Sequence, residues 1–231
     1  EADLGDARMS GSDQGLRAWT PSFAFAGGGF ALGADYVYTH YSYTGLPTRV
    51  RDLHRLGLPL EWTSGTATTL TLAAIPTVAP SSTVSKALFT RATGDDFNLS
   101  GRATVERAPP DGWGWRLGAG YDDRFGDPKA YPIAALLYAS STFDAQIGWP
   151  HARARWKPRE SLRLAVQVEP AGARWHVVSD ERDGAQFDYT VEAWRASIGV
   201  DWEFARRWHL GAQLGSGFDR HHDFGVGTGA P

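Results

Sequence analysis

Apolar and polar side chains alternate along most of this chain with a period of two residues. The pattern is clearest over 162–169 and 194–203, where apolar residues occupy the even positions and polar or small residues the odd positions. A β-strand turns successive side chains to opposite faces, so this period predicts strands with one apolar and one charged face. Such strands suit a sheet that meets lipid on one side and a wet interior on the other.

The same alternation predicts the strand set and the fold class. We expect an all-β fold, a transmembrane antiparallel up-and-down β-barrel of about twelve strands, within a range of roughly ten to fourteen. A flexible N-terminal tail would cover 1–15, and a single barrel domain 16–231. The segment 78–96 has weak periodicity and is expected to be a long loop or a short helix. The predicted strands are 17–26, 30–43, 53–62, 66–77, 97–106, 113–122, 130–139, 142–149, 152–156, 162–169, 173–179, 187–204 and 208–224.

Tryptophan placement favours a membrane barrel over a soluble sandwich. Eight of the ten tryptophans fall near the ends of predicted strands, and indole rings favour the headgroup region of a bilayer. A soluble β domain whose aromatic residues form an ordinary core remains the alternative. The eight are Trp19, Trp62, Trp113, Trp149, Trp156, Trp194, Trp202 and Trp208.

Charged residues on the opposite face of the strands are expected to line a lumen. Both signs occur in similar numbers, which predicts ion pairs braced across the lumen and a narrow or plugged barrel, not a wide selective pore. The predicted lumen-lining residues are Arg55, Glu61, Arg102, Glu106, Arg116, Asp122, Arg153, Arg155, Arg163, Glu169, Arg195, Asp201 and Glu203.

Composition narrows the function classes. The chain has no cysteine, so it can form neither a disulfide nor a thiolate metal site. Its net charge is −3, which gives no basic field for nucleic acid. The chain opens at Glu1 without a methionine, as expected of a mature protein whose signal peptide has been removed. We expect no cofactor and no metal, a location in the cell outer membrane, and outer-membrane lipid, lipopolysaccharide and other envelope proteins as partners.

Three clusters of reactive side chains were weighed as sites. His40 and Ser42 lie two residues apart, hence on one strand face, and resemble the His-x-Ser pair of barrel lipid A deacylases, although their flanking residues do not match. The cluster of Asp219, His221, His222 and Asp223 could in principle hold a divalent metal. Its adjacent histidines would point to opposite strand faces, so a solvated loop tip is expected there instead.

The third cluster is the loop that contains Asp122, Asp123, Arg124 and Asp127. Its carboxylates could hold calcium or act in acid–base catalysis. We expect instead that ion pairs and Asx-turn hydrogen bonds brace this loop. If any loop carries function through its shape, it is this one.

The segment Tyr121–Ile133 resembles a family of uncharacterised Gram-negative outer-membrane β-barrel proteins. Gly148-Trp149-Pro150 and Glu169-Pro170-Ala171-Gly172 resemble the same family, over roughly residues 100–205. The resemblance implies location and architecture, because that family has no assigned activity. One departure is the C-terminal sequence, 225–231, which lacks the terminal aromatic residue usual in such barrels. Either residues are missing there or 208–224 is the closing strand.

Three functions remain open from the sequence. The leading hypothesis is a non-enzymatic barrel, either a narrow or plugged channel or a structural or accessory subunit of an envelope complex. The second is an outer-membrane hydrolase of lipid A or phospholipid that uses His40 and Ser42. The third is a soluble periplasmic β-barrel that binds an apolar ligand.

Overall fold

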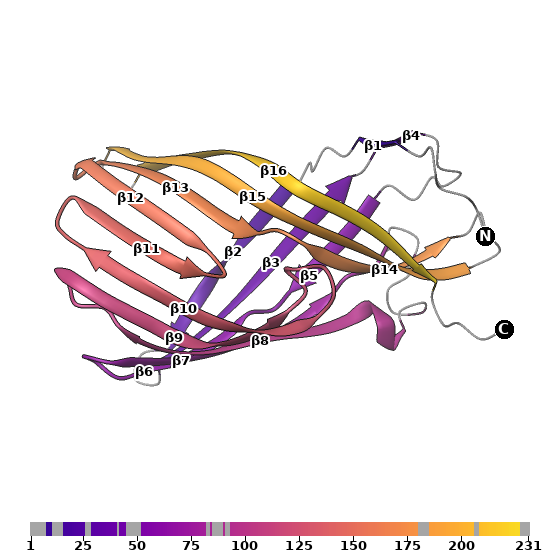
Figure 1. Cartoon of the computed structure of the whole chain (residues 1–231), viewed down its shortest axis with the longest axis horizontal. Helices are drawn as coiled ribbons and strands as arrows, with labels where there is room; N and C mark the ends of the chain where they lie inside the picture. The colour runs from indigo at the N-terminus through magenta and orange to yellow at the C-terminus, as the bar shows by residue number, and fades with distance from the viewer. Residues whose placement is uncertain are drawn as a thin grey trace.

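The computed structural model describes residues 8–10, 16–25, 29–40, 42–44, 52–81, 84, 90, 93–179, 185–205 and 208–226. Most of them belong to one antiparallel sheet of fourteen strands (Figure 1). A separate two-stranded sheet pairs β1 (Arg8–Ser10) with β4 (Ser42–Thr44), so part of the predicted tail forms a strand. Within the described residues, no helix is long and apolar enough to span a membrane.

The large sheet is a meander in which nearly every strand pairs with the next one along the chain. The prediction of an all-β antiparallel sheet is confirmed. The strands are β2 (Leu16–Phe25), β3 (Phe30–His40), β5 (Asp52–Gly57), β6 (Leu60–Ser64), β7 (Thr69–Val78), β8 (Phe97–Arg107), β9 (Gly112–Asp122), β10 (Lys129–Ala139), β11 (Phe143–Trp149), β12 (Ala152–Arg159), β13 (Leu162–Pro170), β14 (Ala173–Ser179), β15 (Ala185–Ala205) and β16 (Trp208–Val226).

Two pairs of consecutive strands are interrupted single strands. β5 and β6 pair with β3 in one unbroken register, from Asp35 opposite Gly57 to Phe30 opposite Trp62. β13 and β14 pair with β15 in the same way. If each pair is taken as one strand, the fourteen strands become twelve, and residue parity along each strand still defines its two faces.

The sheet curls so that β5 and β14, which are distant in strand order, approach each other. The segment 79–81 lies between them: the His54 amide donates to the Pro80 carbonyl (3.0 Å), and the Ser81 amide donates to the His176 carbonyl (3.1 Å). This segment, predicted as part of a loop or short helix, therefore joins two walls of the sheet through backbone hydrogen bonds.

A compact apolar cluster fills the space beneath this bridge. We call the sheet face that carries it the inner face, and this end of the sheet the core end. Trp175 stacks on Tyr189, with ring centroids 5.8 Å apart, and both side chains are buried. The cluster consists of Leu53, Ala79, Ala173, Trp175, Val177, Tyr189, Val191 and Ala193.

Polarity inverts along β13–β14 and β15, which run from the core end to the opposite end of the sheet. The connections 108–111, 140–142 and 160–161 lie at that opposite end, which we call the turn end. On β15, the odd positions face inward; they are apolar at 189–193 and polar or small at 195–203. The even positions face outward and change in the opposite sense, from Asp188, Thr190 and Glu192 to Trp194, Ile198 and Trp202. The core end is thus apolar inside and polar outside, and the rest of the strand is the reverse.

The cluster at the core end predicts a local stability difference between two neighbouring valines. Val177 is 2% exposed in the cluster, whereas Val178 points to the outer face and is only half-buried. Val177→Ala should lower the free energy of unfolding by about 2–3 kcal/mol, because it leaves a cavity. Val178→Ala, the matched control, should cost less than about 1 kcal/mol. Chemical denaturation followed by circular dichroism measures both, and equal losses would contradict the assignment of the inner face.

Candidate functional site

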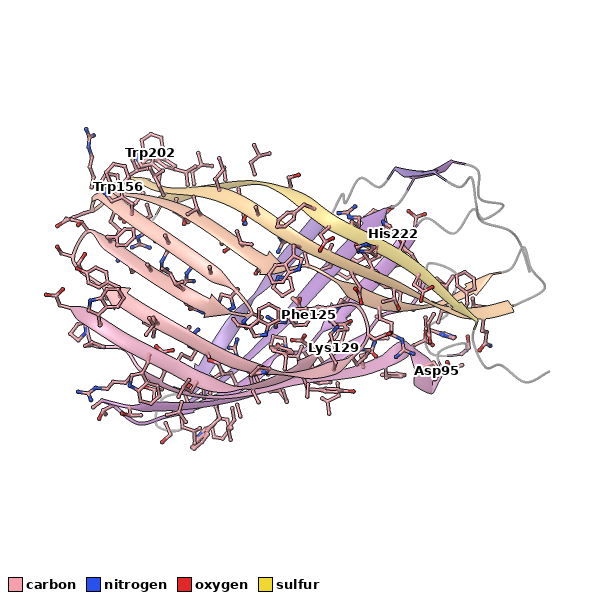
Figure 2. All side chains as sticks on the ribbon, viewed as in Figure 1. Asp95, Phe125, Lys129, Trp156, Trp202 and His222 are labelled. Carbon is pink, nitrogen blue, oxygen red and sulfur yellow. The ribbon has the colours of Figure 1, made fainter. Side chains whose placement is uncertain are left out.

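The inner face gathers all the charged residues that were predicted to line a lumen. The registers from β3 to β15 place every one of them, from Arg55 on β5 to Glu203 on β15, on the same face as Leu53 and Tyr189. The opposite face carries large apolar side chains at high exposure, among them Leu99 (64%), Ile147 (66%) and Leu214 (73%). Figure 2 shows Trp156 and Trp202 on this outer face at the turn end.

Most ion pairs of the inner face run along the wall and not across it, contrary to the sequence-based expectation. Arg116 pairs with Glu106 on the adjacent strand (2.5 Å), and Arg155 pairs with Asp144 (2.6 Å). Arg195–Glu169 is a similar pair, and Arg102 on β8 reaches across β7 to Glu61 on β6. Adjacent strands lie only about 4.8 Å apart, so an arginine finds a carboxylate on a neighbouring strand before it can reach the opposite wall.

The pair between Arg55 and Asp123 is the exception. Arg55 Nη1 and Nη2 each donate to one carboxylate oxygen of Asp123 at 2.8 Å, which is the bidentate geometry. The Arg174 amide also donates to Asp123 (3.2 Å), and the Asp123 side chain is only 4% exposed. One buried carboxylate therefore joins β5, β14 and the β9–β10 loop, and we call this contact the latch.

The β9–β10 loop is braced as its sequence predicts. Asp122 accepts hydrogen bonds from the Arg124 amide (3.1 Å), the Arg124 side chain (2.6 Å) and the Tyr131 hydroxyl (2.7 Å). Gly126 has φ +93°, and a Cβ there would lie 2.6 Å from the Glu192 side chain, so the loop needs glycine at this position. Asp127 is exposed at the loop surface.

The loop also closes a notch in the wall. The short β11–β12 hairpin stops before β10 and β13, and Phe125 occupies the space, stacked on Trp149 (5.3 Å) and edge-on to Trp194 (6.3 Å). The Gly172 amide donates to the Arg124 carbonyl (2.8 Å), which ties the loop to the connection between β13 and β14. Figure 2 shows Phe125 and Lys129 in this central position.

The turn between β11 and β12 holds a neutral histidine. His151 Nε2 lies 2.7 Å from Gln146 Nε2, which donates to it, and Gln146 Oε1 accepts from Arg116 (3.0 Å). Because the Gln146 amide nitrogen can only donate, His151 Nε2 is the acceptor in this contact.

The structure describes the two other candidate clusters to different extents. His40 ends β3 and Ser42 begins β4, and their side chains lie outside the described residues. The cluster from Asp219 to Asp223 was expected at a loop tip, but it lies within β16, at a bulge where Asp219 has φ 51°. As predicted, the histidines face opposite ways: His222 contacts Tyr189 (2.7 Å), and His221 is exposed. Among the described residues, no group of three His, Asp or Glu side chains could hold a metal ion.

Comparison with known proteins gives no relative for this chain. No family model, no curated protein and no solved structure matches it.

The latch predicts that two arginine substitutions on the inner face differ sharply in their effect on the free energy of unfolding. Arg55→Gln would leave the buried Asp123 carboxylate without its counter-charge and should lower the free energy of unfolding by about 3–5 kcal/mol. Arg102→Gln breaks a pair whose side chains are 50% and 36% exposed, so it should cost at most about 1 kcal/mol. Denaturant titration compares the two variants. Losses of the same size would show that Arg55–Asp123 does not hold the loop.

Proposed function

We propose that the chain forms a transmembrane β-barrel of the bacterial outer membrane, plugged at its core end, that acts as a structural or accessory barrel of the envelope. The inversion of polarity along β13–β14 and β15 is the observation that carries this proposal. A soluble barrel needs an apolar interior throughout, whereas only the core end has one. Over the remaining length, the apolar side chains are outside and the ion pairs are inside, which is the arrangement that lipid requires.

The length of the apolar outer band supports a membrane span. On β15 the band runs from Trp194 to Trp202, and on β9 it runs from Trp113 to Tyr121. Each stretch covers nine residues, and a tilted strand needs about 9–11 residues to cross the hydrocarbon core. Aromatic side chains at both limits of the band would lie in the two headgroup regions.

Closure of the barrel belongs to the proposal. β2 and β16 end the strand order, and among the described residues β16 pairs with β15 alone. An open strand edge within lipid leaves backbone groups unpaired, at a cost of several kcal/mol each. We therefore propose that β16 pairs with β2 in the membrane, which would close the meander into a barrel.

The filled core end favours a closed barrel over an open channel. Trp175, Val177 and Tyr189 are 4%, 2% and 1% exposed, so side chains occupy the inner face at this end. The latch adds a further bridge across the interior. Lipopolysaccharide and other outer-membrane lipid would surround the band, and the polar outer surface of the core end would be free to contact envelope proteins.

A charge placed in the outer band separates a membrane barrel from a soluble one. Ile198 lies mid-band and is 59% exposed, so Ile198→Arg in a soluble protein would be a nearly neutral surface change. In vesicles it should cost about 2–4 kcal/mol, because arginine at the bilayer midplane is that unfavourable. Glu192→Arg, outside the band on the same face, should cost at most about 1 kcal/mol. Urea unfolding from lipid vesicles measures both, and no extra loss for Ile198→Arg would refute membrane insertion.

The plug predicts the electrical behaviour of the protein. Reconstituted in planar bilayers, the wild-type chain should show no stable conductance steps, because the cluster around Trp175 and Tyr189 fills the interior. Fusion of protein-free vesicles with the same bilayer gives the baseline current. Regular, long-lived conductance steps from the purified protein would instead establish an open channel.

A further inference from the structure

We call residues that lie opposite one another on successive strands a row. One row of the inner face carries a single charge and lies between two rows that contain ion pairs. The registers align Gln146 on β11, Arg153 on β12, Gln167 on β13 and Ser197 on β15. The neighbouring row toward the turn end contains the pair Arg155–Asp144, and the neighbouring row toward the core end contains Arg195–Glu169. Arg153 is therefore the charged member of this row, and its neighbours on either side are amides and a hydroxyl.

The Arg153 guanidinium has no carboxylate partner among the described residues. The carboxylates nearest in register are engaged elsewhere: Asp144 on β11 pairs with Arg155 and Lys157, and Glu169 on β13 pairs with Arg195. Glu106, further along the wall on β8, pairs with Arg116. Arg153 is also half-buried in the sheet wall. Holding a guanidinium partly away from water without a counter-charge is unfavourable, and an anion from solution would relieve that cost.

A cavity of about 420 Å³ opens on this row. Its polar lining is Arg153, Arg155, Gln167, Ser197, Asp201 and Gln213. The Gln213 amide donates to Ser197 Oγ (2.7 Å), and the Gln167 amide donates to Glu169 (3.1 Å). Each of these amide groups has a second N–H, so the cavity offers neutral donors beside the arginine. Asp201 lies two rows from Arg153, nearer the turn end, which limits the room for a large polyanion.

We infer that this cavity binds a small oxyanion, a phosphate or carboxylate group, against the Arg153 guanidinium. The planar guanidinium donates two parallel hydrogen bonds to such a group, and the amides and the Ser197 hydroxyl can donate to its remaining oxygen atoms. The cavity volume falls in the usual range for small-molecule sites. The inference goes beyond the proposed function, since it depends on the inner face alone and requires neither conduction nor a particular lipid.

Inorganic phosphate is the probe for this site. Isothermal titration and thermal unfolding of the detergent-purified full chain would be run at constant ionic strength, with chloride as the balancing anion. Phosphate should bind and raise the melting temperature of the wild type. Arg153→Gln should weaken binding at least tenfold. The matched control, Arg163→Gln, removes an equal charge from the same wall at an exposed position and should bind within about twofold of wild type.

Two further measurements keep the test decisive. Arg153→Lys retains the charge without the forked geometry and should bind phosphate with intermediate affinity. This variant replaces Arg153→Gln in the test if circular dichroism shows that Arg153→Gln is misfolded. If the wild type ignores phosphate, sulfate and acetate alike, or if Arg153→Gln binds as well as Arg163→Gln does, the inference is wrong. Neither result bears on membrane insertion, which the charge substitution at Ile198 tests separately.

Discussion

The two faces of a β-strand contact two different environments, and the packing of this molecule depends on how the residues of both faces change along the strand. β15 is the clearest case, because it runs without a break from the core end to the turn end. Its parity never shifts, yet the chemical character of both faces exchanges between Ala193 and Trp194. The proposed membrane edge at this point would account for the exchange on the outer face, and the apolar cluster accounts for it on the inner face.

The buried contacts follow from the same constraint. Where the interior is apolar, Trp175 and Tyr189 can pack as they would in a soluble core. Where it is polar, Arg116, Arg155 and Arg195 each pair with a carboxylate on the adjacent strand. The latch lies near the border between the two zones. Arg55 follows Leu53 on the inner face by one step of the alternation, and it reaches Asp123 because the β9–β10 loop folds back over the wall.

The period-two pattern was sufficient to predict most of the fold. The strands over 97–107, 112–122 and 162–170 begin and end within one residue of their predicted limits, because glycine, proline and aspartate mark the turns and alternation marks the faces. The shared face of the charged residues follows from the same parity. The inversion was also visible in the sequence of 187–203, where Tyr189 and Val191 share parity with Arg195 and Asp201. Alternation alone does not reveal it, because the period of two is the same on both sides of the border.

Other features depend on contacts that no local pattern encodes. Arg55 and Asp123 are 68 residues apart, and only the curvature of the sheet brings them together. The bridge through Pro80 and Ser81 has the composition of a loop and gains its regular hydrogen bonds only from β5 and β14 on either side. The charged run at 219–223 is largely exposed, as expected, but it lies in a strand and not at a loop tip, because it pairs with β15.

The central claim is that the border between Ala193 and Trp194 is the edge of a membrane. Spin labels placed one at a time at the even positions from 188 to 202 would test it in lipid vesicles, by their collision rates with oxygen and with a water-soluble nickel complex. We predict high nickel accessibility at 188 and 192, low accessibility at the buried position 190, a switch near 194, and high oxygen accessibility with little nickel contact from 196 to 200. High nickel accessibility along the whole series would contradict the account.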